Sequence, residues 1–194
     1  MGTDTERHRN TELHTSRFSF WIITLMHDNP LLRIIRNPYK LLMAAGLKEG
    51  QKVLEVGCGP GFFTIPAAKI VGEQGLIYAI DVNPFAVRRV KKKIAKEGLR
   101  NVKPSITNAS NTGLPESSID LAFLFGLRYV AGGLGNVMSE IHRILKPGGL
   151  LSFEKTRGSG EELIQDTERA GFSYVDRRGR IFLFIKAKGE EVSR

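Results

Sequence analysis

From residue 53 onward the sequence alternates between short apolar runs and longer segments with helical periodicity. The apolar runs that predict strands span residues 53–56, 76–80, 102–107, 119–125 and 150–154. The run over 119–125 is almost unbroken, which is typical of a strand that is covered on both faces. Strands separated by single helices pair in parallel through right-handed crossovers. The alternation therefore predicts a doubly wound sheet with helices on both of its faces.

Two more apolar runs follow a predicted helix over 161–170 near the end of the chain. They span residues 172–175 and 181–185, and residues 176–179 between them predict a hairpin turn. A hairpin at this point adds an antiparallel edge to the parallel sheet. The expected fold is therefore α/β: a doubly wound, Rossmann-like, mostly parallel sheet of seven strands with an antiparallel C-terminal hairpin strand.

The first 46 residues have a different character from the alternating region. Residues 1–17 are polar and charged without an apolar period, and they predict a mobile tail. Residues 18–46 are apolar and helix-like with breaks at two Asn-Pro pairs, and they predict a helical leader. This leader could pack on the sheet, close over a site as a lid or lie on a membrane surface. The main domain is expected over 47–188, followed by a C-terminal tail over 189–194.

The composition fits an ordinary folded domain and excludes some classes of site. A chain of 194 residues is the size of one domain and can bury a core without disulfides or metals. Cys58 is the single cysteine, which excludes an internal disulfide and a zinc site built from several thiolates, so no metal is expected. The longest apolar run near the start, residues 18–26, is far below the ~20 residues that span a bilayer. We therefore expect no transmembrane segment and a cytoplasmic location.

A glycine-rich loop and an acidic residue follow the first two predicted strands. Ligands of doubly wound sheets lie beyond the carboxyl ends of the strands, where the strand order reverses. Gly57, Gly59 and Gly61 allow positive φ angles and let the backbone approach a ligand closely. Asp81 ends the second strand, 20 residues after Gly61, and its carboxylate could accept hydrogen bonds from both hydroxyls of a ribose. The two features together predict a cofactor that contains a nucleoside.

The loop departs from the dinucleotide fingerprint. That fingerprint reads G-x-G-x-x-G, and its third glycine allows tight packing of the following helix. Counting from Gly57, the third position holds Phe62. A nicotinamide-dependent oxidoreductase is therefore a remote alternative.

Four motifs in chain order resemble those of the class I S-adenosylmethionine-dependent methyltransferases. They read VLEVGCGPGFFT (53–64), AIDVNP (79–84), NASNTGLPESSIDLAFLFG (108–126) and EIHRILKPGGLLSF (140–153). The resemblance covers roughly residues 40–187 and points to the branch of the ubiquinone/menaquinone-type and related small-molecule enzymes. It implies S-adenosylmethionine as cofactor, S-adenosylhomocysteine as product, and a small-molecule or lipid-like methyl acceptor.

The same resemblance implies roles for individual residues. The loop glycines would face the methionine end and the ribose, Glu55 would orient the ammonium group, and Asp81 would hold the ribose hydroxyls. Val82 would pack on the adenine, and Asn108 stands where many relatives have an aspartate that contacts the adenine amino group. Residues 125–127 would lie beneath the sulfonium. The residues assigned to cofactor binding in this way are Glu55, Gly57, Cys58, Gly59, Pro60, Gly61, Phe62, Asp81, Val82, Asn108, Ala109, Phe125, Gly126 and Leu127.

No residue has a spacing that identifies it as a catalytic acid or base. The side chains best placed to border a substrate pocket are His27, Tyr39, Arg128, Tyr129 and Glu154. Glu154 and the adjacent Lys155 could equally form a salt-bridged rim. Cys58 is expected to be a small loop residue and not a nucleophile, because small residues commonly fill this position in the family that the loop resembles.

The net charge of +9 raises a second class of acceptor. The predicted helix over 84–97 carries six cations, Arg88, Arg89, Lys91, Lys92, Lys93 and Lys96. Its apolar residues Ala86, Val90 and Ile94 share one face, so the cations form either a solvated face or a footprint for RNA. The alternatives to a small-molecule enzyme are therefore the same chemistry on RNA or a protein, and a non-catalytic module that binds the cofactor. The oligomeric state is not indicated.

Overall fold

The structure is a computed structural model that describes residues 36–127, 130–155 and 159–187. The predicted tail over 1–17, residues 18–35 of the predicted leader and the predicted tail over 189–194 lie outside the described residues. Within the described part of the chain, no helix is long and apolar enough to cross a membrane.

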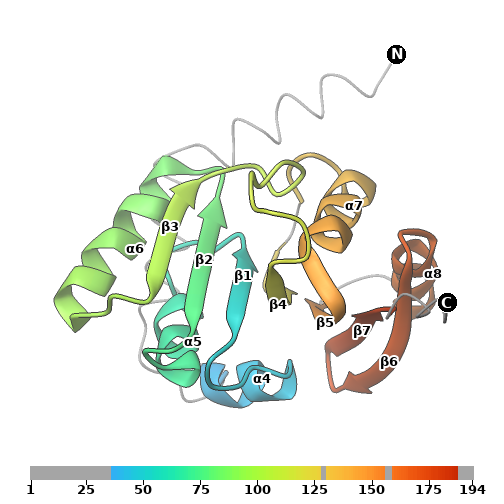
Figure 1. Ribbon diagram of the computed structural model, residues 1–194, viewed down its shortest axis with the longest axis horizontal. Helices are drawn as coiled ribbons and strands as arrows, with labels where there is room; N and C mark the ends of the chain where they lie inside the picture. Colours follow the sequence, from blue (N-terminus) through green and yellow to red (C-terminus); the bar gives the residue numbers. More distant parts are fainter. Residues whose placement is uncertain (1–35, 128–129, 156–158, 188–194) are drawn as a thin grey trace, which may run out of the picture.

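Seven strands form one twisted sheet in the order β3-β2-β1-β4-β5-β7-β6 (Figure 1). The strands are β1 (Lys52–Val56), β2 (Leu76–Asp81), β3 (Val102–Ile106), β4 (Ile119–Leu124), β5 (Leu145–Glu154), β6 (Phe172–Arg178) and β7 (Ile181–Lys186). The first five pair in parallel, whereas β7 is antiparallel to both β5 and β6. The predicted fold class is confirmed.

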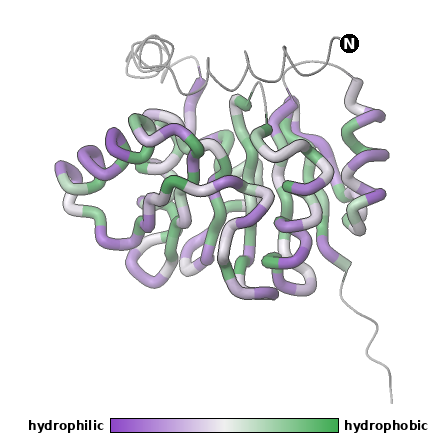
Figure 2. Tube along the Cα trace, turned by 90° about the horizontal axis from the view of Figure 1, so that it is seen from above, coloured by the Kyte–Doolittle hydropathy of each residue, from purple (hydrophilic) through white to green (hydrophobic). Residues whose placement is uncertain are grey.

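Helices cover both faces of the sheet. They are α4 (Pro38–Ala44), α5 (Thr64–Val71), α6 (Pro84–Glu97), α7 (Leu134–Ile144) and α8 (Gly160–Arg169). Buried side chains of α4, α5 and α6 share one apolar cluster with one face of the strands, and those of α7 and α8 share a second cluster with the other face. In Figure 2 the central strands are mostly hydrophobic, while hydrophilic segments gather on the surrounding helices and loops.

The strand order reverses between β1 and β4. The chain runs from β1 outward through β2 to β3 and then returns to place β4 on the other side of β1. Val56 is in register with Ile80 of β2 and with Leu124 of β4, so these three strands end at the same edge. The segments that follow β1, β2 and β4 therefore meet at the edge where ligands of doubly wound sheets bind.

Helix α6 begins and ends where its sequence predicts. The Asn83 side chain accepts a hydrogen bond from the Phe85 N–H at 2.9 Å, Pro84 occupies the first turn, and Gly98 ends the helix with φ +67°. Ala86 and Val90 are buried, whereas the cations at positions 88, 89, 91, 92 and 96 are exposed. The cations thus lie on the outward side of an amphipathic helix.

Two predicted boundaries near the end of the chain are wrong. Strand β5 begins at Leu145 and not at Leu150, because Leu145 pairs with Ile119 and the KPGG segment forms an irregularity before Leu150 pairs with Leu121. The predicted turn over 176–179 is mostly strand, since residues 176–178 pair with β7 after a second irregularity in β6. Only two residues, 179 and 180, connect β6 to β7.

A buried carboxylate fastens the segment between β3 and β4 to helix α7. Glu140 is 9% exposed and accepts hydrogen bonds from the N–H and hydroxyl of Thr112 and from the Arg143 guanidinium. The same guanidinium donates to the Leu114 carbonyl at 2.7 Å. Hydrogen bonds from Arg143, with those from Thr112, lower the pKa of Glu140 to about 2 against the opposing effect of its burial.

We therefore expect Glu140→Gln to lower the free energy of unfolding by about 2 kcal/mol at pH 7. The stabilisation is present above about pH 4.5 and is lost as the pH falls toward 2, because the unfolded chain takes up the proton first. Urea denaturation at both ends of this range measures the difference. The exposed Glu168→Gln is the matched control, expected within ~0.5 kcal/mol of the native protein. Equal effects of the two substitutions would contradict the prediction.

Candidate functional site

The glycine loop after β1 bends through three positive φ angles. They are +72° at Gly57, +51° at Gly59 and +83° at Gly61, a region that favours glycine. The Gly57 and Cys58 N–H groups donate to the Ile80 carbonyl at 2.8 and 3.0 Å, which ties the loop to β2. A Cβ at Gly59 would meet no heavy atom of the described residues within 4 Å. The backbone at Gly59 thus faces open space.

Asp81 joins this loop to the start of α6. Its carboxylate accepts hydrogen bonds from the Gly59 N–H at 2.9 Å and from the Asn83 N–H at 2.8 Å. The side chain lies at the end of β2 and is half-buried. The structure therefore brings together the two sequence features that predict a nucleoside site.

Glu55 is a buried carboxyl group beneath the loop. It is 2% exposed, and its Oε2 accepts a hydrogen bond from the Thr64 hydroxyl at 2.6 Å. Among the described residues, its other oxygen, Oε1, accepts no hydrogen bond. Burial raises the pKa of Glu55 to about 8, with the Thr64 hydroxyl lowering it and the charge of Asp81 raising it. The site thus holds a carboxyl group that a neighbouring cation would ionise at neutral pH.

Cys58 has the properties of a packing residue. It is 4% exposed, and burial raises the pKa of its thiol well above the usual range, with the charges of Glu55 and Asp81 acting in the same direction. A thiol that stays protonated is a poor nucleophile. Pro60 is buried beside it, and Phe62 is 2% exposed within the apolar cluster, where its ring meets that of Phe63 edge to face at 4.9 Å.

The segment after β4 lies against the glycine loop. A Cβ added at Gly57 would fall 2.3 Å from Leu127 Cδ2, so the Leu127 side chain packs directly on that glycine. Phe125 is buried, and its ring centroid is 5.3 Å from that of Phe63. Apolar side chains therefore border the loop on the side of β4.

The remaining predicted cofactor residues follow β2 and β3. Val82 is half-buried, and Ala109 is 5% exposed within the second apolar cluster. The Asn108 amide oxygen accepts hydrogen bonds from the N–H and hydroxyl of Ser110, both at 3.0 Å. Asn108 thus fixes a turn beside the site with the same oxygen that would contact an adenine.

An ion pair that the sequence does not indicate lies at the same edge of the sheet. Arg36, just before α4, pairs with Glu154, the last residue of β5. The Gly126 N–H also donates to Glu154 Oε2, at 3.0 Å, and the Arg36 guanidinium lies over the Phe63 ring, 5.2 Å from its centroid. Glu154 thus forms an ion pair with Arg36, a partner far away in the sequence, and not with the adjacent Lys155.

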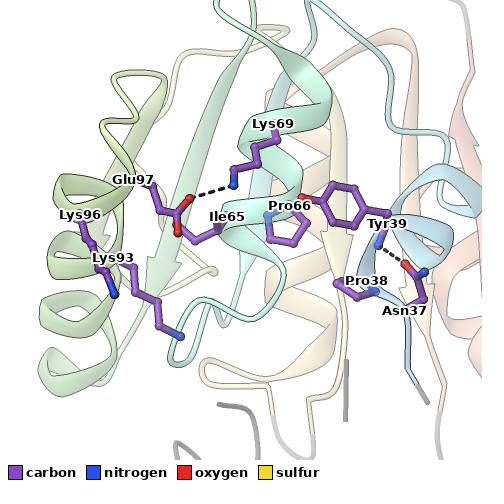
Figure 3. Close-up of a pocket in the computed structure, with 9 residues that line it drawn as sticks. All are labelled: Asn37, Pro38, Tyr39, Ile65, Pro66, Lys69, Lys93, Lys96 and Glu97. Atoms are coloured by element: carbon purple, nitrogen blue, oxygen red, sulfur yellow. Dashed lines mark hydrogen bonds and ion pairs between the residues drawn. The ribbon is translucent and has the colours of Figure 1, made fainter. Parts of the chain in front are cut away.

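Of the other four predicted pocket residues, the structure describes only Tyr39. His27, Arg128 and Tyr129 lie outside the described residues. Tyr39 is 42% exposed and borders a separate cleft of about 400 Å³ between α4, α5 and α6 (Figure 3). The residues that line this cleft are Asn37, Pro38, Tyr39, Ile65, Pro66, Lys69, Lys93, Lys96 and Glu97. Neither the loop glycines nor Asp81 is among them.

Residues 47–181 match a family model described as "Methyltransferase domain". The chain belongs to this methyltransferase family. The family predicted from the four sequence motifs is therefore confirmed.

Relatives and solved structures agree with this assignment. The chain is 36% identical over 105 residues to the demethylmenaquinone methyltransferase of Geobacillus stearothermophilus, covering 54% of the chain and 44% of that protein. It is 32% identical over 105 residues to the aklanonic acid methyltransferase of Streptomyces sp. strain C5, covering 54% and 47%. The chain thus spans less than half of the length of these curated relatives. A SAM-dependent methyltransferase from Aquifex aeolicus superposes with a TM-score of 0.70 and 29% identity, covering 84% of this chain and 95% of that one.

Proposed function

We propose that this chain is an S-adenosylmethionine-dependent methyltransferase whose acceptor is a small or lipid-like molecule. The observation that carries the proposal is the hydrogen bond between Asp81 and the Gly59 N–H, which unites the glycine loop and the acidic residue at the point where the strand order reverses. A carboxylate beside an open stretch of glycine backbone suits a ribose. Membership of the methyltransferase family supports the same conclusion.

The residues present fit the proposed cofactor. Glu55 Oε1 is a buried oxygen without a hydrogen-bond donor among the described residues, which suits the ammonium group of the amino-acid end. The open backbone at Gly59 leaves room for close approach, and Asp81 would hold the ribose hydroxyls. Val82 and Asn108 are the residues proposed for the adenine. S-adenosylmethionine, when bound, would supply a methyl group activated by the positive charge of its sulfonium.

The chain itself would contribute orientation and exclusion of water. Leu127 packs on Gly57, and Phe125 of the same segment is buried against Phe63, so the segment that follows β4 is apolar. Fixing two reactants in line supplies on the order of 7–11 kcal/mol of the barrier. A general base is needed only for a protonated acceptor atom. The proposed transfer to the acceptor is therefore an in-line displacement that depends mainly on positioning.

The class of acceptor rests on the named relatives. Those two proteins are named for demethylmenaquinone and aklanonic acid, which are small molecules, and this supports a small-molecule or lipid-like acceptor here. RNA is the alternative, because α6 presents exposed cations. If RNA is the acceptor, the affinity of the protein for RNA should fall steeply as the salt concentration rises. The experiment below separates these acceptors.

We expect label from methyl-tritiated S-adenosylmethionine to enter the lipid or small-metabolite fraction when the protein is incubated with an extract of its source. The extract is afterwards separated into lipid, metabolite, RNA and protein fractions, and each is counted. The Asp81→Ala variant is the control, expected to transfer little label. Label in the RNA or protein fraction would overturn the proposed acceptor. Calorimetric binding of S-adenosylhomocysteine without transfer to any fraction would instead indicate a non-catalytic module.

A further inference from the structure

Glu154 is a buried carboxylate that accepts hydrogen bonds through only one of its two oxygens among the described residues. Its side chain is 3% exposed, and Oε2 accepts both the Gly126 N–H and the Arg36 guanidinium. Among the residues that the structure describes, Oε1 accepts no hydrogen bond. Buried carboxylate oxygens are ordinarily satisfied, because leaving one without a donor costs free energy. This oxygen is therefore available to a bound water molecule or to a hydrogen-bond donor of a ligand.

The position of Glu154 connects it to the acceptor side of the proposed site. It ends β5, which pairs with β4, and it holds the backbone of Gly126. The next residue, Leu127, packs on Gly57 of the glycine loop. The hydrogen-bond partner of the carboxylate is therefore directly adjacent in sequence to the residue whose side chain touches the proposed cofactor loop. The acceptor must approach this loop for methyl transfer, and this connectivity makes Glu154 a candidate for contact with it.

We infer that Glu154 accepts a hydrogen bond from a hydroxyl group of the methyl acceptor, and that Arg36 is the positioning residue that holds the carboxylate for it. This inference rests on the proposed function. A neutral hydroxyl is favoured over an ammonium, because the adjacent Arg36 already balances the charge of Glu154 and would repel a second cation. The Phe63 ring, over which the guanidinium lies, is itself buried, so the inference concerns the hydroxyl group of the acceptor and not the shape of the rest of it.

Arg36 is well built for a positioning role. Its guanidinium lies over the Phe63 ring, and its two terminal nitrogens are both 3.7 Å from the position of a Cβ on Gly126. A planar group held by a ring, a carboxylate and nearby backbone has little freedom to turn. Arg36 lies next to Asn37, the N-cap of α4, so the ion pair connects the chain before this helix to the end of β5.

The test compares two probes, phenol and its methyl ether anisole. Phenol can donate a hydrogen bond from its hydroxyl group, whereas anisole has no hydrogen-bond donor. Binding of each to the full chain, saturated with S-adenosylhomocysteine, is measured by saturation-transfer NMR. We expect the native protein to bind phenol about tenfold more tightly than anisole. Glu154→Leu should bind the two probes equally. Arg36→Met should reduce the preference at least threefold, and Arg36→Lys should restore part of it. The exposed pair Asp166–Arg169 gives a matched control, since Arg169→Met should leave the preference unchanged.

The outcomes separate this inference from the function on which it rests. Calorimetry first measures the affinity of each variant for S-adenosylhomocysteine, so that both probes are compared on protein saturated with it. If the native protein does not bind S-adenosylhomocysteine, the proposed function fails. If it does bind, then equal affinities for phenol and anisole, absence of phenol binding, or a preference that survives in Glu154→Leu would overturn the inference alone. Should Glu154→Leu fail to fold, Glu154→Gln and the Arg36 variants decide, because a purely structural ion pair would leave the hydroxyl preference intact in every folded variant.

Discussion

Replacing Asp81 by alanine is expected to weaken the binding of S-adenosylhomocysteine by at least roughly 100-fold. In the proposed site this carboxylate accepts hydrogen bonds from the ribose hydroxyls, and hydrogen bonds to a charged group contribute about 1.5–3 kcal/mol each. The substitution also removes the acceptor of the Gly59 N–H, so the glycine loop loses its link to the end of β2. Isothermal titration calorimetry at fixed pH and salt measures the dissociation constant directly.

Two further variants show which part of the side chain matters. Asp81→Asn keeps one oxygen acceptor of similar shape, so its loss of affinity should fall between that of the native protein and that of Asp81→Ala. Asp166→Ala removes an exposed carboxylate of α8 and should leave the affinity unchanged. Urea denaturation of each variant establishes that it is folded. Binding by a folded Asp81→Ala variant within threefold of the native protein would refute the assigned role.

The parts of the fold that the sequence predicts best are those fixed by local signals. Helix α6 has an asparagine cap, a proline in its first turn and a glycine at its end, and all three act within the helix itself. The start of β5 and the turn between β6 and β7 depend on how residues pair across strands. Such registers, including the irregularities in β5 and β6, depend on the pairing between strands, so the runs of apolar residues locate the strands but not their ends.

The candidate site divides in the same way. The glycine loop and Asp81 each follow a predicted strand, and a parallel sheet brings such segments to one edge, so their proximity could be predicted. Arg36 and Glu154 are 118 positions apart, and no sequence motif or regular spacing indicates that they form an ion pair. Glu154 could be recognised as a rim residue because it ends a strand, but its partner depends on how the segment before α4 packs. The family resemblance predicts Leu127 as a cofactor residue, while its packing on Gly57 is visible only in three dimensions.

The second large expected effect is a change in folding stability with pH that is caused by Glu55. Its pKa is raised from 4.5 to about 8, so the folded protein binds this proton more tightly than the unfolded chain does. Folding stability from this group is therefore greatest below about pH 4.5 and declines as the pH rises toward 8. We expect the native protein to lose on the order of 3–5 kcal/mol across this range relative to Glu55→Gln, whose side chain does not ionise.

Urea denaturation of both proteins at intervals between pH 4.5 and pH 8.5 measures this difference, and subtraction of the two profiles cancels the contributions of all other titrating groups. The native protein and Glu55→Gln should have similar stability at the acidic end, because both then bury a neutral group that can bond to Thr64. At the alkaline end Glu55→Gln should be the more stable, because the native protein must bury a charge. The exposed Glu49→Gln serves as control and should give a flat difference. A flat difference for Glu55→Gln as well would mean that the carboxylate is already stabilised in the free protein, and Glu55 would then have no unmet demand for the ammonium group of the proposed cofactor.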